Sequence, residues 1–574
     1  MMQNRFKSIT ANMSAAKRPV ASLDRRERQI DKPPLLNGET ILAEAQSVLK
    51  YNKMSKRGSG VMGSLYITNF KLAFMMTKIE STSSLNQRMM QLSCRALDDL
   101  LVYDESSSDS EFIPLTSISY LTAISTVKQV SKRLTPGKVP SKKYDIIEIS
   151  CKDFRVVQFD FSLCRDKERA AVINTIHVYS SPTSLYKLFA FDYARGANNA
   201  AKASARGRAF HTFRHEKDLE LELARLRAQE HWRISRVNED FALCKTLPEL
   251  NLVPSSLDDD TLKSVSGFYV DGRFPTLVWH SRETGAALLS SSAPSDQEDV
   301  NGGHSQKIIQ GICDGLFGTA MKVPIVVDAS LLFPSLKELQ ASYCELFGSS
   351  LYHTSKDYWA SDSTWLSKVD NSRWLQYVQT ALTAASEIAN SLLIGQTSVI
   401  VHDLSGRDFT PLLVSLVQLL VDPYYRTVIG LESLIQKEWV VKGHPFSQRL
   451  GPIKEATKSP KNMIFYRDEY VLDTNESPIF ILFLDCVHQL LTQFPSRFGF
   501  TEQFLLLLID GVYMCLFETF LFDTEYDRKK FNSNALESLW DFLATKIPPE
   551  KFKTLFLNQF YNIDKNTTQN YYSL

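Results

Sequence analysis

Residues 397–427 hold the side chains of this sequence that are best placed to do chemistry on an anion. Residues 399–401 are apolar and β-branched, and a long apolar run follows Pro411. This pattern predicts a strand, a short loop and a helix, with Thr410 as the N-cap and Pro411 at the first helical position. Free backbone amides and the positive end of the helix dipole then meet at the loop. The segment therefore predicts an anion cradle, meaning a loop whose amides surround a bound oxyanion.

The residues inside this loop decide what the cradle can do. Phosphatases that use cysteine place a low-pKa thiolate at the start of such a loop and an arginine six positions later, which holds the phosphoryl oxygens. Here Asp403 occupies the first position and Phe409 the second, and none of the eight cysteines has an arginine six positions after it. We therefore expect no phosphocysteine chemistry. We also expect the Asp403 carboxylate to fill the cradle and to repel a dianionic phosphate.

Three neighbouring side chains admit more than one interpretation. An ion pair between Arg407 and Asp403 would lock the cradle shut. Asp408 is interpreted as a structural residue that caps amides of the turn, and His402 as a hydrogen-bonded core histidine, because no Cys or His lies at ligand spacing. The complete degenerate loop is Asp403, Leu404, Ser405, Gly406, Arg407, Asp408 and Phe409.

An enzymatic hypothesis is that Asp403 acts as a nucleophile. It would form an acyl-phosphate, as aspartate-based phosphatases do. Such enzymes use a metal ion to neutralise the phosphate, and the sequence shows no second acidic cluster placed to hold one. We expect neither a metal ion nor another cofactor.

The elements around the loop predict an α/β domain. Strand-like runs alternate with apolar helical runs from residue 232 onward, as expected for a mixed or parallel sheet covered by helices on both faces. Leu219, Leu223 and Leu226 are spaced for an amphipathic helix, which would dock on its own domain or form a coiled-coil face for a partner. The strand-like runs are 276–280, 323–330 and 397–404, and the helical runs include 411–421, 477–494 and 503–522.

The N-terminal third of the chain has a different pattern. Runs at 64–76 and 144–161 predict half-buried antiparallel strands, and a helix is expected at 166–177. We interpret this region as a small barrel with a helix. A linker rich in small and basic residues follows it. One loop between the strands carries six cations that could meet a lipid headgroup: Lys128, Lys132, Arg133, Lys138, Lys142 and Lys143.

Composition narrows the class of protein further. A chain of 574 residues that is 44% hydrophobic, with a formal charge of +1, predicts two or three folded units and no nucleic-acid partner. Eight cysteines without a Cys-x-x-Cys pair predict a reduced, cytoplasmic protein without a zinc module. The apolar run 504–522 contains Asp510 and Glu518, so we expect a buried helix there. Trp365, Trp374 and Trp439 are interpreted as packing residues.

Several long motifs resemble one family. VHDLSGRDFT at 401–410, followed by DPYYRTVIGLESLIQKEW and GHPFSQRLG, is similar to the active-site strand, loop and helix of myotubularins. ETILAEAQSVLK and LYITNFKLAF resemble the PH-GRAM domain of that family. The GRD of the loop and the IQKEW after it are similar to the inactive branch, the phosphatase adapters called myotubularin-related proteins 10 to 12.

The resemblance implies an architecture and a role for each loop position. The family's nucleophile falls on Asp403, its arginine on Phe409 and its proposed general acid on Asp408, while its first loop aspartate and its tryptophan fall on Ser405 and Arg407. The fold implied is a PH-GRAM domain followed by a cysteine-phosphatase-like α/β domain. The expected segments are a disordered basic tail at 1–34, the PH-GRAM domain at 35–190, a linker at 191–212, the inactive phosphatase domain at 213–550 and a C-terminal tail at 551–574.

The function implied is that of a non-catalytic subunit. Its expected partner is an active myotubularin 3-phosphatase, which it would regulate in the turnover of phosphatidylinositol 3-phosphate or 3,5-bisphosphate. The alternative is a phosphoinositide-binding module that recruits the chain to anionic membranes through the PH-GRAM domain without a phosphatase partner. Either role places the protein in the cytoplasm and peripherally on endomembranes.

Overall fold

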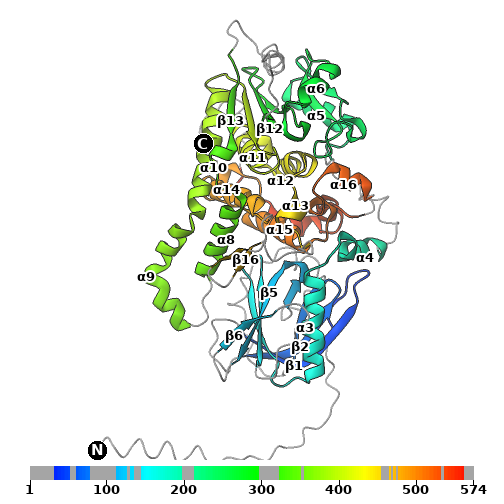
Figure 1. Cartoon of the computed structure of the whole chain (residues 1–574), viewed down its shortest axis with the longest axis vertical. Coiled ribbons are helices and arrows are strands. Elements are labelled where there is room, and N and C mark those ends of the chain that lie inside the picture. Colours follow the sequence, from blue (N-terminus) through cyan, green and yellow to red (C-terminus); the bar gives the residue numbers. More distant parts are fainter. Residues whose placement is uncertain are drawn as a thin grey trace, which may run out of the picture.

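The computed structural model consists of an N-terminal β-sheet unit and a larger unit of helices around a smaller sheet, which Figure 1 shows packed against each other. The structure describes residues 32–51, 60–77, 111–125, 130–134, 144–196, 212–295, 322–350, 355–453, 464–466, 470–472, 476–531 and 536–561. The predicted basic tail at 1–34 therefore lies almost wholly outside the described residues.

The N-terminal unit is an antiparallel sheet in the order β4-β3-β2-β1-β8-β7-β5-β6, as expected for a PH-like domain. Helix α3 (Asp166–Ser180) packs against β1 and buries Val172, Ile173 and Ile176 in the core of this unit. The run 64–76 forms the hairpin of β2 and β3. The strands are β1 (Ile41–Tyr51), β2 (Val61–Thr68), β3 (Lys71–Met76), β4 (Glu111–Pro114), β5 (Ile118–Ser125), β6 (Val130–Arg133), β7 (Ile146–Cys151) and β8 (Val156–Asp160).

The larger unit is built on a mixed sheet in the order β11-β12-β14-β13. Strands β11 (Thr276–His280) and β12 (Ala287–Ser292) are antiparallel, whereas β12, β14 (Val399–Asp403) and β13 (Ile325–Asp328) run parallel. The predicted mixed or parallel sheet is thus confirmed. Strand β14 begins with the apolar, β-branched residues 399–401, and every residue of the strand is buried. A continuous apolar run of this kind is expected for a parallel strand covered on both faces.

Long helices pack around this sheet. Helices α10 (Trp374–Leu393) and α11 (Phe409–Val421) contact β14 and each other, and α14 (Ile479–Gln493) packs against both helices. The other elements are α4 (Phe189–Gly196), α5 (Glu216–Leu226), β9 (Trp232–Ser235), β10 (Asn251–Pro254), α6 (Asp259–Ser266), α8 (Leu336–Ser350), α9 (Ser355–Ser372), α12 (Val428–Ile435), α13 (Phe446–Arg449), β15 (Ile464–Tyr466), β16 (Tyr470–Leu472), α15 (Glu502–Met514), α16 (Glu525–Lys530), α17 (Leu539–Thr545) and α18 (Pro549–Phe556).

Two predicted boundaries differ from the structure. Helix α4 continues to residue 196, so the start of the predicted linker at 191–212 is helical, and residues 197–211 of that linker lie outside the described residues. At the other end, α18 crosses the predicted start of the tail at 551–574. Phe552 and Phe556 lie one helical turn apart and are both buried against the core, which explains why the fold extends this far.

Of the predictions for single helices and tryptophans, some were confirmed and some were wrong. The run 503–522 is not one helix, because α15 ends at Met514 and Cys515 adopts a left-handed backbone with φ of 52°. No helix in the described part of the chain has both the length and the apolar character needed to span a bilayer. Trp374 and Trp439 are buried, but Trp365 is 41% exposed, so its interpretation as a packing residue was wrong. Helix α5 docks on its own domain through its buried leucines.

Candidate functional site

The candidate site is the loop between β14 and α11, at the carboxyl ends of the parallel strands. Helix α11 begins at Phe409, one residue earlier than Thr410, which was predicted to cap it. Pro411 therefore lies at the third helical position, where its missing N–H still has no intrahelical acceptor to lose. The predicted N-cap was wrong because the capping oxygen comes from a residue further back, Asp403.

The Asp403 carboxylate fills the loop. Its Oδ1 accepts hydrogen bonds from the amides of Ser405 (2.9 Å) and Gly406 (2.7 Å), and also from the Ser405 hydroxyl (3.2 Å). Its Oδ2 accepts from the amides of Asp408 (3.2 Å) and Thr410 (2.8 Å). Asp403 is only 3% exposed. The predicted occupation of the cradle by this carboxylate is confirmed: four backbone donors surround it at the helix N-terminus, as they would surround an oxyanion.

Gly406 lets the loop close tightly over the neighbouring strand β12. Its φ is +67°, and a Cβ added there would lie 2.5 Å from the carbonyl oxygen of Ser291. Any other residue would therefore be both strained and in steric conflict with the backbone. The retained glycine explains how the amide of residue 406 reaches Asp403.

Arg407 does not pair with Asp403, so that hypothesis was wrong. Its Nε donates to the carbonyl oxygen of Gly443 at 2.6 Å, and its terminal nitrogen donates to the carbonyl oxygen of Asp523 at 2.8 Å. Burial lowers the pKa of Arg407, against an opposing effect of nearby carboxylates. Asp403 is already satisfied by amides, which leaves the guanidinium to bind the backbone of two distant segments.

Asp408 forms an ion pair rather than the predicted cap. Its two carboxylate oxygens accept bidentate hydrogen bonds of 2.9 and 2.8 Å from Arg449. Burial alone would raise the pKa of Asp408, but the hydrogen bonds and the charge of Arg449 hold the pKa below its usual value.

His444 lies beside this ion pair. Its Nδ1 is 2.8 Å from the carbonyl oxygen of Arg407, and burial lowers the pKa of His444 to about 4. His444 is therefore neutral at pH 7 and donates through Nδ1.

Phe409, at the position of the expected phosphate-binding arginine, belongs to the core. Its ring stacks on Phe333 with centroids 4.7 Å apart and an interplanar angle of 8°. By contrast, Leu404 is 69% exposed at the outer side of the loop. At position 409 the loop therefore places an apolar ring in the core, where an active phosphatase would have a cationic side chain.

Arg273 is a loop contact that the sequence did not reveal. Its guanidinium is buried and donates to the carbonyl oxygens of Thr246, of Lys442 (3.0 Å) and, in a long contact of 3.4 Å, of Gly406. Burial lowers the pKa of Arg273 to about 10, so it remains charged. No local pattern links it to a loop that follows 133 residues later.

His402 lies in the core as predicted, but the expected hydrogen bond is absent at one ring nitrogen. The Nδ1 of His402 has no hydrogen-bond partner and lies 3.9 Å from a carboxylate oxygen of Asp328. Within the described ranges, no group of three or more His, Cys, Asp or Glu side chains is placed to hold a metal ion.

The predicted lipid-binding cations are only partly described. Lys132 and Arg133 belong to β6, an edge strand of the N-terminal sheet. Lys132 is exposed, and the guanidinium of Arg133 lies 4.4 Å from the ring centroid of Tyr120. The remaining four, Lys128, Lys138, Lys142 and Lys143, lie outside the described residues.

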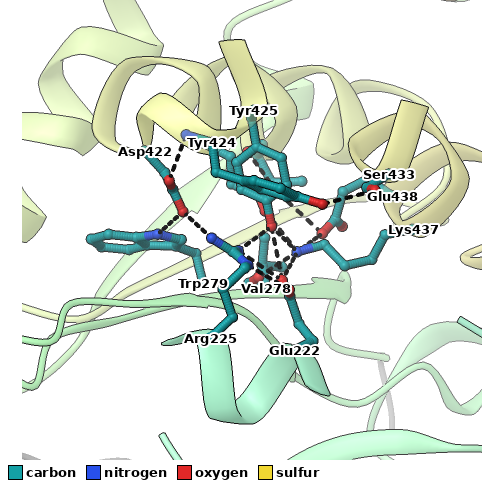
Figure 2. Close-up of polar contacts among 12 residues, drawn as sticks. Glu222, Arg225, Val278, Trp279, Asp422, Tyr424, Tyr425, Ser433, Lys437 and Glu438 are labelled. Atoms are coloured by element: carbon teal, nitrogen blue, oxygen red, sulfur yellow. Dashed lines mark hydrogen bonds and ion pairs between the residues drawn. The ribbon is translucent and has the colours of Figure 1, made fainter. Parts of the chain in front are cut away.

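A buried polar network holds the other end of α11, as Figure 2 shows. At its centre, Lys437 lies in a short π-helix (Gln436–Val441) and donates to Glu222 (2.9 Å), to the carbonyl oxygen of Val278 (3.0 Å), to Gln418 (2.8 Å) and to Tyr425 (2.7 Å). The network thus joins α5, β11, α11 and the turn that follows α11.

Glu222 is the main anion of this network. Burial alone would raise its pKa, but the charges and hydrogen bonds of Lys437 and Arg225 hold it far below the usual value for a glutamate. Arg225 also donates to Asp422 at 2.6 Å, and Asp422 accepts a bond of 3.3 Å from the Trp279 ring nitrogen (Figure 2). The buried charges are therefore paired with one another, as buried charges in folded proteins usually are.

Comparisons with known proteins agree with this geometry. A family model described as the myotubularin-like phosphatase domain matches residues 188–329 and 330–529, which is more than half of the chain. Myotubularin-related protein 10-A of Xenopus laevis is 32% identical over 509 residues, covering 87% of this chain and 61% of the relative. The chain therefore spans about three fifths of that relative's length.

Two human proteins are similarly related. Myotubularin-related protein 10 of Homo sapiens is 30% identical over 575 residues, covering 93% of this chain and 68% of the relative. Myotubularin-related protein 12 of Homo sapiens is 31% identical over 547 residues, covering 92% and 66%. These are relatives of the branch that the loop sequence resembles. Together with the family model, they show that the chain belongs to the myotubularin family.

Proposed function

We propose that this chain is a non-catalytic pseudophosphatase that acts as a regulatory adapter subunit of an active myotubularin phosphoinositide 3-phosphatase. The observation that carries the proposal is the position of the Asp403 carboxylate. It takes the four amides that a cysteine-based phosphatase would offer to the substrate's phosphoryl group. The loop thus has the backbone geometry of a phosphatase loop, but the carboxylate of Asp403 occupies the place of the phosphoryl group.

The filled loop opposes both binding and catalysis. A dianionic phosphate would have to displace a buried carboxylate or come close to it, and like charges repel strongly where water is excluded. No thiolate stands at this position, and Phe409 is stacked in the core where the oxygen-binding arginine is expected. A scaffold that keeps the fold but fills the reaction centre retains its surfaces for binding another protein.

The catalytic half of the proposal is tested with the purified chain. We expect no release of phosphate from phosphatidylinositol 3-phosphate, with or without Mg²⁺, above the level of an Asp403→Asn variant. The variant is the matched control because it keeps the shape of the side chain and removes its charge. Turnover by the unmodified chain that Asp403→Asn abolishes would overturn the proposal in favour of an acyl-phosphate mechanism.

The adapter half is tested by affinity capture of the full chain from cells, followed by mass spectrometry. We expect an active myotubularin among the abundant captured proteins, and we expect the purified chain to change that enzyme's activity or stability. Asp403→Asn should capture the same partner, because the role proposed does not use the loop chemistry. Capture without any active myotubularin would contradict this half.

The edge strand β6 favours a second candidate, contact with an anionic membrane. Lys132 is exposed there and stands next to Arg133. Reversing both charges, Lys132→Glu with Arg133→Glu, should reduce flotation with vesicles that contain phosphatidylinositol 3-phosphate, since each basic residue near such a surface contributes about 1 kcal/mol. Lys167→Glu on α3, also at an exposed position, is the control. Equal flotation of all three proteins would remove β6 from the membrane contact.

A further inference from the structure

A hollow of about 250 Å³ lies where the two units of the molecule meet, between the turn that joins β7 to β8 and the helices of the larger unit. Figure 1 shows α8 and α15 at this junction, close to the N-terminal sheet. Its lining is mostly apolar. The residues are Phe154, Tyr343, Leu346, Trp374, Ile481, Leu484, Asp485, His488, Glu502, Leu505, Leu506 and Ile509.

The walls of the hollow are held in place by contacts between the two units. Phe154 adopts a φ of 64° and packs its ring against Tyr343 and Phe347, with centroids 5.0 and 4.9 Å away. The Tyr343 hydroxyl donates to the carbonyl oxygen of Lys152 at 3.3 Å, and the Thr116 hydroxyl donates to that of Tyr513 at 2.7 Å. The hollow is therefore a formed feature of the interface.

Two carboxylates, those of Asp485 and Glu502, line the hollow together with the ring of His488. Asp485 accepts from the Trp374 ring nitrogen at 2.6 Å and from Gln489 at 3.0 Å, which leaves free lone pairs on its oxygens. Glu502 lies 3.6 Å from the ring of His488, and its side chain is 62% exposed. No lysine or arginine lines the hollow. The site therefore combines an apolar interior with negative charge at its edge.

Size indicates what kind of ligand suits this site. A cavity of about 150 Å³ admits benzene, so this hollow has room for an aromatic or large aliphatic side chain. Pockets for whole small molecules are usually larger, about 300 to 1,000 Å³. The volume therefore favours one anchoring side chain of a peptide over a complete small-molecule ligand.

We infer that this hollow is a docking site for a partner peptide in which a bulky apolar residue stands beside a lysine or arginine. The apolar side chain enters between Leu506 and Ile509, and the basic residue meets Glu502 and Asp485. Anchors of this kind supply most of the binding energy of an interface, and charge complementarity selects the partner. The inference is independent of the adapter role, because it assumes no phosphatase as the partner.

The test is selection of a random peptide library displayed on phage against the purified full chain. We expect enriched peptides to carry Trp, Phe or Leu next to Lys or Arg. Leu506→Trp should fill the hollow and weaken these peptides about tenfold or more, as loss of a hot-spot anchor does. Leu221→Trp on α5, a partly exposed leucine at the far end of the larger unit, should leave binding unchanged.

A charge reversal separates the electrostatic part of the inference from the packing part. Glu502→Lys should select peptides with an acidic residue in place of the basic one, whereas Glu220→Lys on α5 should not change the selection. Thermal unfolding of each variant checks that it is folded. Enriched peptides without a basic residue, peptides unaffected by Leu506→Trp, or a selection that enriches no peptide would each overturn the inference.

Discussion

Helix α11 has a buried charge near each end, and the two ends stabilise that charge in different ways. Near its N-terminus, Asp403 is held by four backbone amides that all lie within the next seven residues. Near its C-terminus, Lys437 is held by side chains and a carbonyl from segments up to 215 residues away. The partners of Asp403 are thus backbone groups close in sequence, whereas the partners of Lys437 come from segments spread over the domain.

This difference predicts how each end responds to substitution. Backbone amides remain in place when the side chain at 403 changes, so water or a bound anion can replace the lost carboxylate. The acceptors around Lys437 are buried side chains, and one of them is a charged glutamate that keeps its charge when the lysine is removed. The network end should therefore be the more sensitive of the two.

The largest effect is expected from Lys437→Met. The substitution leaves Glu222 buried with the charge of Arg225 and the hydroxyl of Tyr425 as its remaining partners, and it removes four hydrogen bonds, which should lower the free energy of unfolding by about 3 to 5 kcal/mol. Urea denaturation measures the change. The control is Lys263→Met on α6, whose side chain is 54% exposed and pairs with Asp260 on the surface. A loss for Lys437→Met as small as that of the control would show that the network adds little stability.

Asp403→Ala should have the next largest effect. It removes the side-chain acceptor of four backbone amides and leaves the amide of Gly406 with a long bond of 3.3 Å to the carbonyl oxygen of residue 403, so we expect a loss of about 2 to 4 kcal/mol in urea denaturation. Because the cradle is then empty, inorganic phosphate should raise the midpoint of the variant more than chloride at equal ionic strength does. The unmodified protein should show no such difference. An equal response of both proteins to phosphate would mean that the loop of the variant has collapsed.

The same contrast explains what the sequence could reveal. The strand, the loop and the helix are contiguous, so periodicity and the substituted Asp403 and Phe409 positions predicted a filled cradle. The helix start was wrong because residue types cannot show that Asp403, seven positions earlier, supplies the capping oxygen. Sequence proximity also suggested the wrong partner for Arg407, which binds carbonyls 36 and 116 residues away.

The network at the other end was missed altogether. Lys437 and Glu222 stand on separate helices, and each has an ordinary amphipathic or apolar neighbourhood in the sequence. Only the fold brings them together, because tertiary contacts between distant segments leave no periodic signal. The motif IQKEW marked the position of Lys437 through the family resemblance, but its spacing gave no reason to expect a buried charge.

His444 should give the loop end a pH dependence. Burial depresses the pKa of His444 to about 4 in the folded protein, below the unfolded value of about 6.5. The unfolded chain therefore binds the proton more readily. The contribution to stability is complete above about pH 6.5 and is lost as the pH falls toward 4, amounting to about 2 kcal/mol between pH 7 and pH 5.

His444→Asn isolates this contribution, because its amide can still donate to the carbonyl oxygen of Arg407 but does not titrate. Urea denaturation at pH 7 and pH 5 should show that the unmodified protein loses about 2 kcal/mol more than the variant. Equal losses in the two proteins would place the source of the acid sensitivity elsewhere.

A smaller effect than those above is expected from Tyr425→Phe, which tests how the hydrogen bonds of the network are shared among its members. The Tyr425 hydroxyl donates to Glu222 at 2.8 Å and accepts from Arg225 (2.8 Å) and Lys437 (2.7 Å). Each of these partners keeps other partners in the network when the hydroxyl is removed. We therefore expect a loss of only about 1 kcal/mol in urea denaturation.

Tyr424→Phe is the matched control, since its hydroxyl lies 3.2 Å from Ser433 at the margin of the same network (Figure 2) and should cost less. If Tyr425→Phe costs as much as Lys437→Met, the bonds strengthen one another and the network acts as a single cooperative unit. If it costs about 1 kcal/mol, the charge pair of Lys437 and Glu222 carries the stability, and the hydroxyl only completes their hydrogen bonding.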